Sequence, residues 1–252
     1  MGNLHEIESY INNELRLGET PDYSAAHNGL QLSNNGTVTK VAAAVDASLP
    51  VIRKAINEGA DMLVVHHGLF WQGVQRLVAA QYDKFAEAIQ ANLAIYSAHI
   101  PLDVHPVMGN NALLAKAVAM DSFIYYHDWK GIKLGVRQKM ELGFDEMIQR
   151  IEAAVGQEVH YCRGRQEPSV GVVGIITGGA GSEIAAMAAQ GIDTFITGEG
   201  PHWSYPLAEE LGVNLIYAGH YATETFGVKA LTSQIANKWQ LPQVFIDHPT
   251  GL

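Results

Sequence analysis

The chain alternates short β-branched hydrophobic runs with amphipathic stretches in which apolar residues recur every three or four positions. Runs of the first kind predict buried strands, and stretches of the second kind predict helices that bury one face. We expect strands over residues 38–45, 62–65, 94–97, 170–176, 194–197, 214–217 and 244–246, and helices over 49–57, 83–91, 110–119, 182–189, 206–211 and 223–238. Such alternation is typical of α/β folds.

Two phrases of the sequence occur twice, and they divide the chain more clearly than any linker does. Segments 58–68 and 190–200 both contain a glycine suited to ending a helix, an aspartate, a buried strand, a polar pair and a further glycine. Segments 92–99 and 214–220 also match, and an acidic residue follows the histidine of each by four positions. We therefore predict two similar α/β halves, residues 1–125 and 126–252, related by a pseudo-twofold axis. Chance reuse of strand–turn–helix phrases is the alternative.

Composition narrows the class of protein. The 252 residues include 26 acidic and 16 basic side chains, a net charge of −10, which argues against a dedicated nucleic-acid face. The single cysteine, Cys162, excludes a disulfide framework and a thiolate metal cage, although the neighbouring Arg163 and Arg165 could lower its pKa. No apolar run approaches the roughly 18 residues of a membrane span, and the first residues are acidic. We expect a soluble cytoplasmic protein.

Histidine and carboxylate side chains follow the predicted strands, or begin a helix, at four separate places. These are His66 with His67, His99 with Asp103, Glu199, and His220 with Glu224. Open α/β sheets bind their ligands at the carboxyl ends of strands. Imidazole and carboxylate without sulfur suit Zn, Fe(II), Mn, Co or Mg, and carboxylates can bridge two ions about 4 Å apart. The sequence therefore predicts a metal site, which we place in the cleft between the two halves.

The first two groups each have a structural alternative. Neighbouring side chains on a regular strand point to opposite faces, so His66 and His67 share one cavity only if the strand ends there, which Gly68 permits. Otherwise the pair is ordinary loop polarity. Pro101 favours an irregular loop over residues 99–103, and in that loop Asp103 is either a ligand or a turn residue.

Two further segments also allow more than one interpretation. If a helix has begun by Tyr221, His220 and Glu224 project from neighbouring turns on one side; otherwise Glu224 simply suits the positive end of a helix. The segment 177–182, Thr-Gly-Gly-Ala-Gly-Ser, offers backbone N–H groups to a phosphate. It lacks the lysine of a P-loop, and an N-cap at Ser182 after a tight turn is the favoured alternative.

Over nearly its whole length the chain resembles the YbgI-type dinuclear metal-centre family, also called NGG-interacting-factor-like proteins or GTP cyclohydrolase type 2 homologues. The segments that carry the resemblance are Asn28-Gly-Leu-Gln31, Val65-His-His-Gly-Leu-Phe-Trp71, His99-Ile-Pro-Leu-Asp-Val104, Gly109-Asn-Asn-Ala-Leu-Leu-Ala115, Ile196-Thr-Gly-Glu199 and Gly219-His-Tyr-Ala-Thr-Glu224. The paired histidines together with the late Gly-His-x3-Glu motif are the specific combination. Ala26-His27, before Asn28, departs from the family pattern and leaves the role of this loop open.

The resemblance implies a site for two divalent metal ions. Its ligands would be His66, His67, Asp103, His220 and Glu224, with Glu224 bridging the ions. His99 would lie beside the metals as an outer or proton-transfer residue. Family members resemble toroidal hexamers built as trimers of dimers, with the metal sites facing an interior cavity.

Three functions follow as hypotheses. The first is a metal-dependent hydrolase acting on a nucleotide or related small molecule, with His99 and Glu199 moving protons. The second is a non-catalytic ring or adaptor protein that holds metal in closed coordination. The third is a nucleotide-binding regulatory module that uses residues 178–182.

Overall fold

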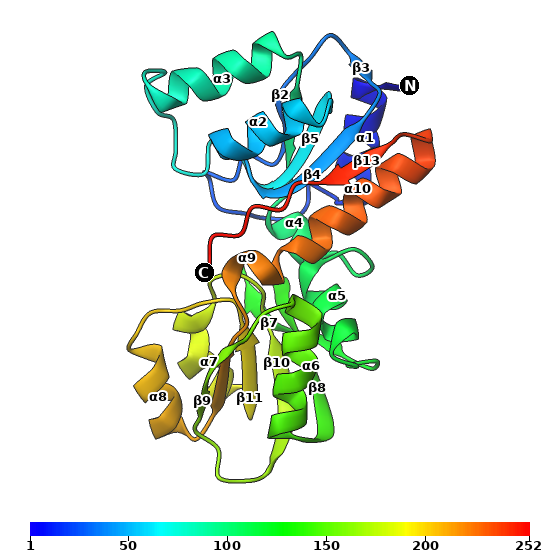
Figure 1. The fold of residues 1–252 in the computed structure, drawn as a ribbon. Helices are drawn as coiled ribbons and strands as arrows, with labels where there is room; N and C mark the ends of the chain where they lie inside the picture. Colours follow the sequence, from blue (N-terminus) through cyan, green and yellow to red (C-terminus); the bar gives the residue numbers. More distant parts are fainter. The chain divides into compact units, whose positions relative to one another are not determined.

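A computed structural model describes residues 1–252, which form two compact units (Figure 1). The first unit comprises Met1–Leu102 with Gly227–His248, and the second comprises Asp103–Phe226 with Pro249–Leu252. The boundary thus lies before Asp103, and not at 125/126 as the repeats suggested. The C-terminal segment joins the first unit because strand β13 (Gln243–Phe245) pairs in parallel with β4 (Val41–Asp46). Alternation of strands and helices does not reveal which sheet a strand joins.

The first unit is built on a five-stranded sheet with the order β13-β4-β5-β6-β2. Its remaining strands are β5 (Met62–His67), β6 (Ala94–Ser97) and β2 (Gly29–Leu32). All pairs are parallel except β2 with β6. The short strands β1 (Gly2–Asn3) and β3 (Thr37–Val38) form a separate antiparallel ribbon. The parallel order brings the carboxyl ends of β4, β5 and β6 to one edge.

Helices cover both faces of this sheet, with α2 (Leu49–Asn57) and α3 (Ala80–Gln90) on one side and α1 (Leu4–Glu14) and α10 (Thr225–Trp239) on the other (Figure 1). Helix α2 begins at Ser48, whose side chain accepts from the N–H of Val51. Its apolar residues join alternate residues of β4 and β5 in one buried cluster. Because successive side chains of a strand point to opposite faces, each face of the sheet presents apolar residues to one layer of helices.

The second unit is built on a six-stranded sheet with the order β7-β8-β10-β11-β12-β9. Its strands are β7 (Ile124–Trp129), β8 (Ile132–Gly143), β9 (His160–Arg163), β10 (Ser169–Ile175), β11 (Thr194–Thr197) and β12 (Asn214–Tyr217). Its helices are α5 (Asn110–Ala117), α6 (Phe144–Val155), α7 (Ile184–Ala189), α8 (Ser204–Leu211) and the short α9 (His220–Thr223).

The two units share the topology of their central strands. In the first, β4-α2-β5-α3-β6 forms three parallel strands, and in the second, β10-α7-β11-α8-β12 does the same. In each unit, a strand that comes earlier in the chain lies antiparallel beside the third of these parallel strands: β2 beside β6, and β9 beside β12. The prediction of two similar α/β halves is confirmed at this level.

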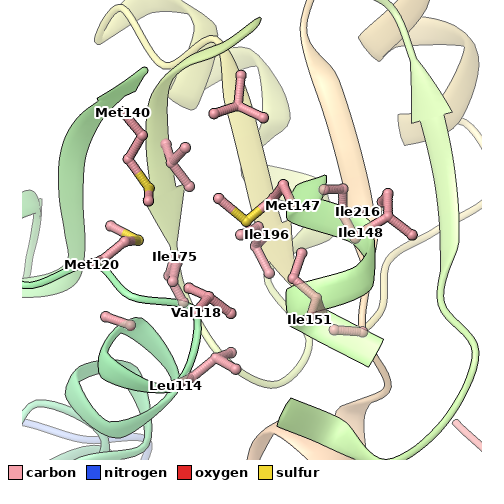
Figure 2. Packing of buried hydrophobic residues seen from close by; sticks show 14 of the residues in the cluster. Leu114, Val118, Met120, Met140, Met147, Ile148, Ile151, Ile175, Ile196 and Ile216 are labelled. Atoms are coloured by element: carbon pink, nitrogen blue, oxygen red, sulfur yellow. The ribbon is translucent and has the colours of Figure 1, made fainter. Parts of the chain in front are cut away.

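The core of the second unit lies between its sheet and the helices α5 and α6 (Figure 2). Ile175, Ile196 and Ile216 come from three neighbouring strands and point to the same face. Met147 and Ile151 of α6 pack against this face, and both are fully buried.

None of the helices combines the length and apolar character that a bilayer crossing requires.

Most of the expected elements are present, with informative differences. The expected helix 49–57 matches α2, whereas the expected strand 38–45 is divided into β3 and β4. The segment around Pro101 is a short helix, α4 (Ile100–Asp103), and not the irregular loop that we expected. Proline is tolerated there because the first turn of a helix does not use its backbone N–H.

Candidate metal centre

The paired histidines are the last two residues of strand β5, which ends at His67. The end of the strand at this point is the condition under which both side chains can share one cavity. Both residues are buried, and their ring centroids lie 4.9 Å apart. His66 donates through Nδ1 to the carbonyl oxygen of Ala98 at 2.8 Å. His67 Nδ1 lies 2.9 Å from the carboxylate of Asp46, its partner across the strands β4 and β5.

His99 follows the neighbouring strand β6 and joins this pair. Its ring centroid lies 4.8 Å from that of His66 and 5.5 Å from that of His67. One ring nitrogen of each of the three histidines lies within 4.8 Å of the others. The parallel arrangement of β5 and β6 produces this cluster, because both strands end at the same edge of the sheet.

Asp22 and Asn28 hold His99 in place, and the sequence did not identify either role. The buried carboxylate of Asp22 accepts from His99 Nδ1 at 2.8 Å and from Asn28 Nδ2 at 2.7 Å. Asn28 Oδ1 in turn accepts from the backbone N–H of His99 at 2.7 Å. Burial acts to raise the pKa of Asp22, but the hydrogen bond from His99 and its companions lower it overall. The loop around Asn28 therefore positions His99.

Replacing Asp22 with alanine should lower the free energy of unfolding by about 3–5 kcal/mol, because several buried donors lose their acceptor. Urea denaturation of the metal-free protein measures this change. Asp128→Ala is the matched control, since that side chain is 78% exposed and pairs only with Lys133 at the surface. We expect the control to stay within about 0.5 kcal/mol of the wild type. Equal stability of the two variants would contradict a positioning role for Asp22.

Asp103 ends α4 and is buried in the second unit. Its Oδ1 accepts from Asn110 Nδ2 at 2.7 Å and from Thr177 Oγ1 at 3.4 Å. Asn111 donates to the Asp103 carbonyl oxygen at 3.2 Å, and its own Oδ1 accepts from the N–H of Thr177 at 2.8 Å. Asp103 is thus fixed by side chains from α5 and from the end of β10.

His220 and Glu224 lie on the same side of the chain at helix α9, as expected if the helix begins by Tyr221. His220 Nε2 lies 3.2 Å from Glu224 Oε1, and Glu224 is almost completely buried. Two ligand atoms about 2.0–2.2 Å from a shared ion are separated by about 3 Å at tetrahedral or octahedral angles, so this pair fits one cation. His220 Nδ1 lies 2.8 Å from Glu199 Oε1.

The carboxylates around His220 determine its charge. Burial acts to lower the pKa of His220, but the hydrogen bonds and charges of Glu224 and Glu199 raise it to about 9. The metal-free protein therefore holds this imidazole protonated at neutral pH. Because metal ligation needs the neutral ring, binding of a cation here releases a proton.

All four histidines are oriented in the same way. Each has Nδ1 against an acceptor: the carbonyl of Ala98 for His66, Asp46 for His67, Asp22 for His99 and Glu199 for His220. An acceptor at Nδ1 fixes the proton there and assigns the lone pair of the neutral ring to Nε2. This arrangement is typical of metal-ligating histidines, whose other ring nitrogen is held by a carboxylate or carbonyl.

The glycine-rich segment 177–182 packs against the His220–Glu224 pair. Gly178 has φ +72°, and a Cβ at this position would lie 2.3 Å from Glu224 Oε1 and 3.4 Å from His220 Nε2. A Cβ at Gly179 would contact the His220 ring at an ordinary 3.5 Å. A side chain at position 178 would therefore displace the Glu224 carboxylate from the position that it has here.

Neither interpretation of this segment from the sequence agrees with the structure. The N–H groups of Gly178, Ala180 and Gly181 donate to Thr223 Oγ1, Thr197 Oγ1 and the Glu199 carbonyl oxygen, so they do not form a phosphate cradle. Ser182 lies inside the 3₁₀ turn Gly181–Glu183 and does not cap α7. Close packing of the segment 177–182 against neighbouring parts of the chain accounts for its glycines instead.

Cys162 is not activated by the arginines beside it. Burial raises the pKa of its thiol to about 11. Arg165 pairs with Asp193, and the Arg163 guanidinium lies over the Phe144 ring. The expectation of a lowered pKa is therefore wrong, and Cys162 contributes to the core.

The residues present fit divalent cations. The first unit provides three clustered imidazoles, and the second provides an imidazole with two buried carboxylates. This set of nitrogen and oxygen donors without sulfur suits borderline or hard ions. The fold and these groups define a class: an α/β protein of two similar units with histidine and carboxylate groups that could hold metal ions.

Comparison with known proteins identifies the family. The chain belongs to the Duf34/NIF3 (NGG1p interacting factor 3) family, whose model matches residues 2–250. A relative from Deinococcus radiodurans, named GTP cyclohydrolase 1 type 2 homolog, is 41% identical over 98% of this chain and 94% of its own length. One of the same name from Pyrococcus abyssi is 39% identical and covers 98% of both chains. The solved structure of protein ybgI, described as of unknown function, superimposes with a TM-score of 0.89 at 32% identity and covers both chains completely.

Proposed function

We propose that this protein binds two divalent cations per chain and hydrolyses a nucleotide or a related small molecule. The observation that carries the proposal is the common orientation of the four histidines, each with Nδ1 held by an acceptor. A hydrogen-bonded imidazole of this kind is pre-organised as a metal ligand. The name shared by the relatives, GTP cyclohydrolase 1 type 2 homolog, supports a nucleotide as the substrate class.

The residues that would hold the cations in this proposal are His66, His67, Asp103, His220 and Glu224. A divalent cation held by these residues would polarise a substrate oxygen and lower the pKa of a water molecule towards neutrality. Hydrogen-bond partners orient these residues: Asp46 contacts His67, Asn110 contacts Asp103 and Glu199 contacts His220.

His99 and Glu199 are the proposed proton carriers. Asp22 holds the Nδ1 side of His99, so that Nε2 of this ring is the atom that exchanges a proton with substrate. Glu199 is about 40% exposed at its side chain, which gives its carboxylate access to solvent while one oxygen orients His220. The two residues thus combine positioning with proton transfer.

Metal analysis and turnover test the proposal together. The protein as isolated is analysed for metals, stripped with a chelator and reloaded separately with Zn, Fe(II), Mn, Co or Mg. We expect about two ions per chain and hydrolysis of at least one member of a nucleotide panel that depends on the metal. Two tightly held ions without turnover would favour the non-catalytic ring or adaptor role. Failure to bind any of these ions would overturn the proposal.

We also propose that the chain forms a homo-oligomer, a hexamer by resemblance to the family. Large apolar side chains between 36% and 84% exposed gather along one segment: Trp71, Val74, Leu77, Val78 and Tyr82. Exposed apolar surface of this kind is typical of interfaces between proteins. Native mass spectrometry should show a species of six times 27.3 kDa. A monomer at micromolar concentration would contradict this assembly.

A further inference from the structure

A pocket in the second unit has no role in the proposed metal site. Its volume is about 420 Å³, and its lining residues are His160, Gly200, Pro201, His202, Tyr205 and Tyr217. Pockets that hold small molecules range over about 300–1,000 Å³ and are lined mainly by apolar and aromatic side chains. Four of the six lining residues carry planar rings, so the walls of this pocket are largely ring faces.

Two rings of the pocket are nearly parallel, and a third is tilted towards them. His160 and Tyr217 lie directly opposite each other on the antiparallel strands β9 and β12. Their planes are 5° apart and their centroids are separated by 6.4 Å. The Tyr205 ring of α8 is tilted by 32° to the His160 ring at a centroid distance of 5.6 Å. His160 is exposed, and Tyr205 and Tyr217 are partly exposed, so all three side chains reach the solvent.

Tyr217 is held rigidly by its neighbours. Its hydroxyl donates to Ser204 Oγ, because Ser204 itself donates to the Pro201 carbonyl oxygen at 2.5 Å. A Cβ at Gly200 would lie 2.7 Å from the Tyr217 oxygen, and a Cβ at Gly181 would lie 2.9 Å from its ring. The two glycines therefore make room for this ring. A wall that is ordered before binding costs a ligand less conformational entropy.

The pocket adjoins the part of the second unit that holds His220. Gly200 directly follows Glu199, and Tyr217 precedes His220 by three residues along the chain. Glu199 and His220 are joined by their 2.8 Å contact. The candidate proton carrier Glu199 and the candidate metal ligand His220 are thus close in the sequence to two residues that line the pocket.

We propose that this pocket binds the planar heteroaromatic ring of a nucleobase-type ligand, which stacks on His160, Tyr205 and Tyr217. Stacking on aromatic side chains is the general way in which proteins hold a base without reading its sequence. The orientation of the ligand's remaining groups towards Glu199 and His220 rests on the proposed function. The stacking itself does not require metal, and this allows the two proposals to be tested separately.

Titration of the chelator-stripped protein with inosine, followed by saturation-transfer NMR, tests the pocket alone. Ribose is the ligand control, because it lacks the planar ring. We expect inosine to bind and ribose not to bind. His160→Ala should weaken inosine binding about 5- to 150-fold, since one stacking contact is worth about 1–3 kcal/mol. Undetectable inosine binding by the wild type, or equal binding of inosine and ribose, would overturn the proposal.

The neighbouring residue provides a matched control for folding. Tyr161 is next to His160 on β9 but packs against Phe144, with ring centroids 5.2 Å apart. Tyr161→Ala should leave inosine affinity unchanged, and Tyr217→Phe should retain it because the ring remains. Equal losses in His160→Ala and Tyr161→Ala would refute the pocket. Metal content is measured on the same variants and is expected to equal that of the wild type. This measurement distinguishes a failure of the proposed metal site from a failure of the proposed pocket.

Discussion

Glu224→Gln should reduce metal affinity at least 100-fold while leaving the fold intact. Glu224 is a proposed metal ligand, it is almost completely buried, and its Oε1 lies 3.2 Å from His220 Nε2. Loss of an outer residue that only orients a ligand costs about 10- to 100-fold in affinity, and loss of a charged ligand should cost more. Glutamine keeps the shape of the side chain but removes the charge that raises the pKa of His220, so the metal-free variant should lose roughly 1–3 kcal/mol of stability at neutral pH and still fold. Titration with Zn or Mn against a competing chelator measures the affinity.

Two further glutamate variants extend this test: one should have an intermediate effect on metal affinity, and the other is a control. Glu199→Gln alters the residue that contacts the other nitrogen of His220, and we expect a loss of about 10- to 100-fold. Glu210→Gln changes an exposed side chain of α8 and should have no effect. If Glu224→Gln bound both ions as tightly as Glu210→Gln, Glu224 would not be a ligand. Unchanged turnover in Glu224→Gln would exclude the proposed hydrolytic site.

The sequence predicted the parallel strands and the residues that follow them. Short β-branched runs and the repeated phrases located β5, β6, β11 and β12, and the carboxyl ends of these strands carry the histidines and Glu199. These features depend on local periodicity and on a general property of open α/β sheets. The positions of the candidate ligands within each unit follow from them directly.

Other features depend on contacts between residues far apart in the sequence. Asp22 reaches His99 across 77 positions, and β13 joins β4 only when the fold has formed. No local pattern identifies such partners. The β7–β8 hairpin turns at Lys130 and Gly131, which both have positive φ, without the Asn-Gly signature that predicts such a turn. The role of the segment 177–182 could not be decided from the sequence, because close packing and phosphate binding both favour glycine.

Gly178→Ala should impair both stability and metal binding, whereas Gly179→Ala should impair neither. Alanine at φ +72° costs about 1–2 kcal/mol in backbone strain. The new Cβ would also lie 2.3 Å from Glu224 Oε1, and such overpacking typically adds about 1–3 kcal/mol. We therefore expect the free energy of unfolding to fall by about 2–5 kcal/mol, and metal affinity to fall with the displacement of Glu224. Urea denaturation and chelator competition measure the two effects.

Gly191→Ala separates the two causes. Gly191 has φ +75°, almost the value of Gly178, but a Cβ there would have no atom within 4 Å. This variant should show the backbone strain of about 1–2 kcal/mol with metal affinity unchanged. The difference between Gly178→Ala and Gly191→Ala thus isolates the contact with Glu224. Wild-type metal affinity in Gly178→Ala would show that this carboxylate is free to move without loss of the site, and would remove the structural reason for glycine at position 178.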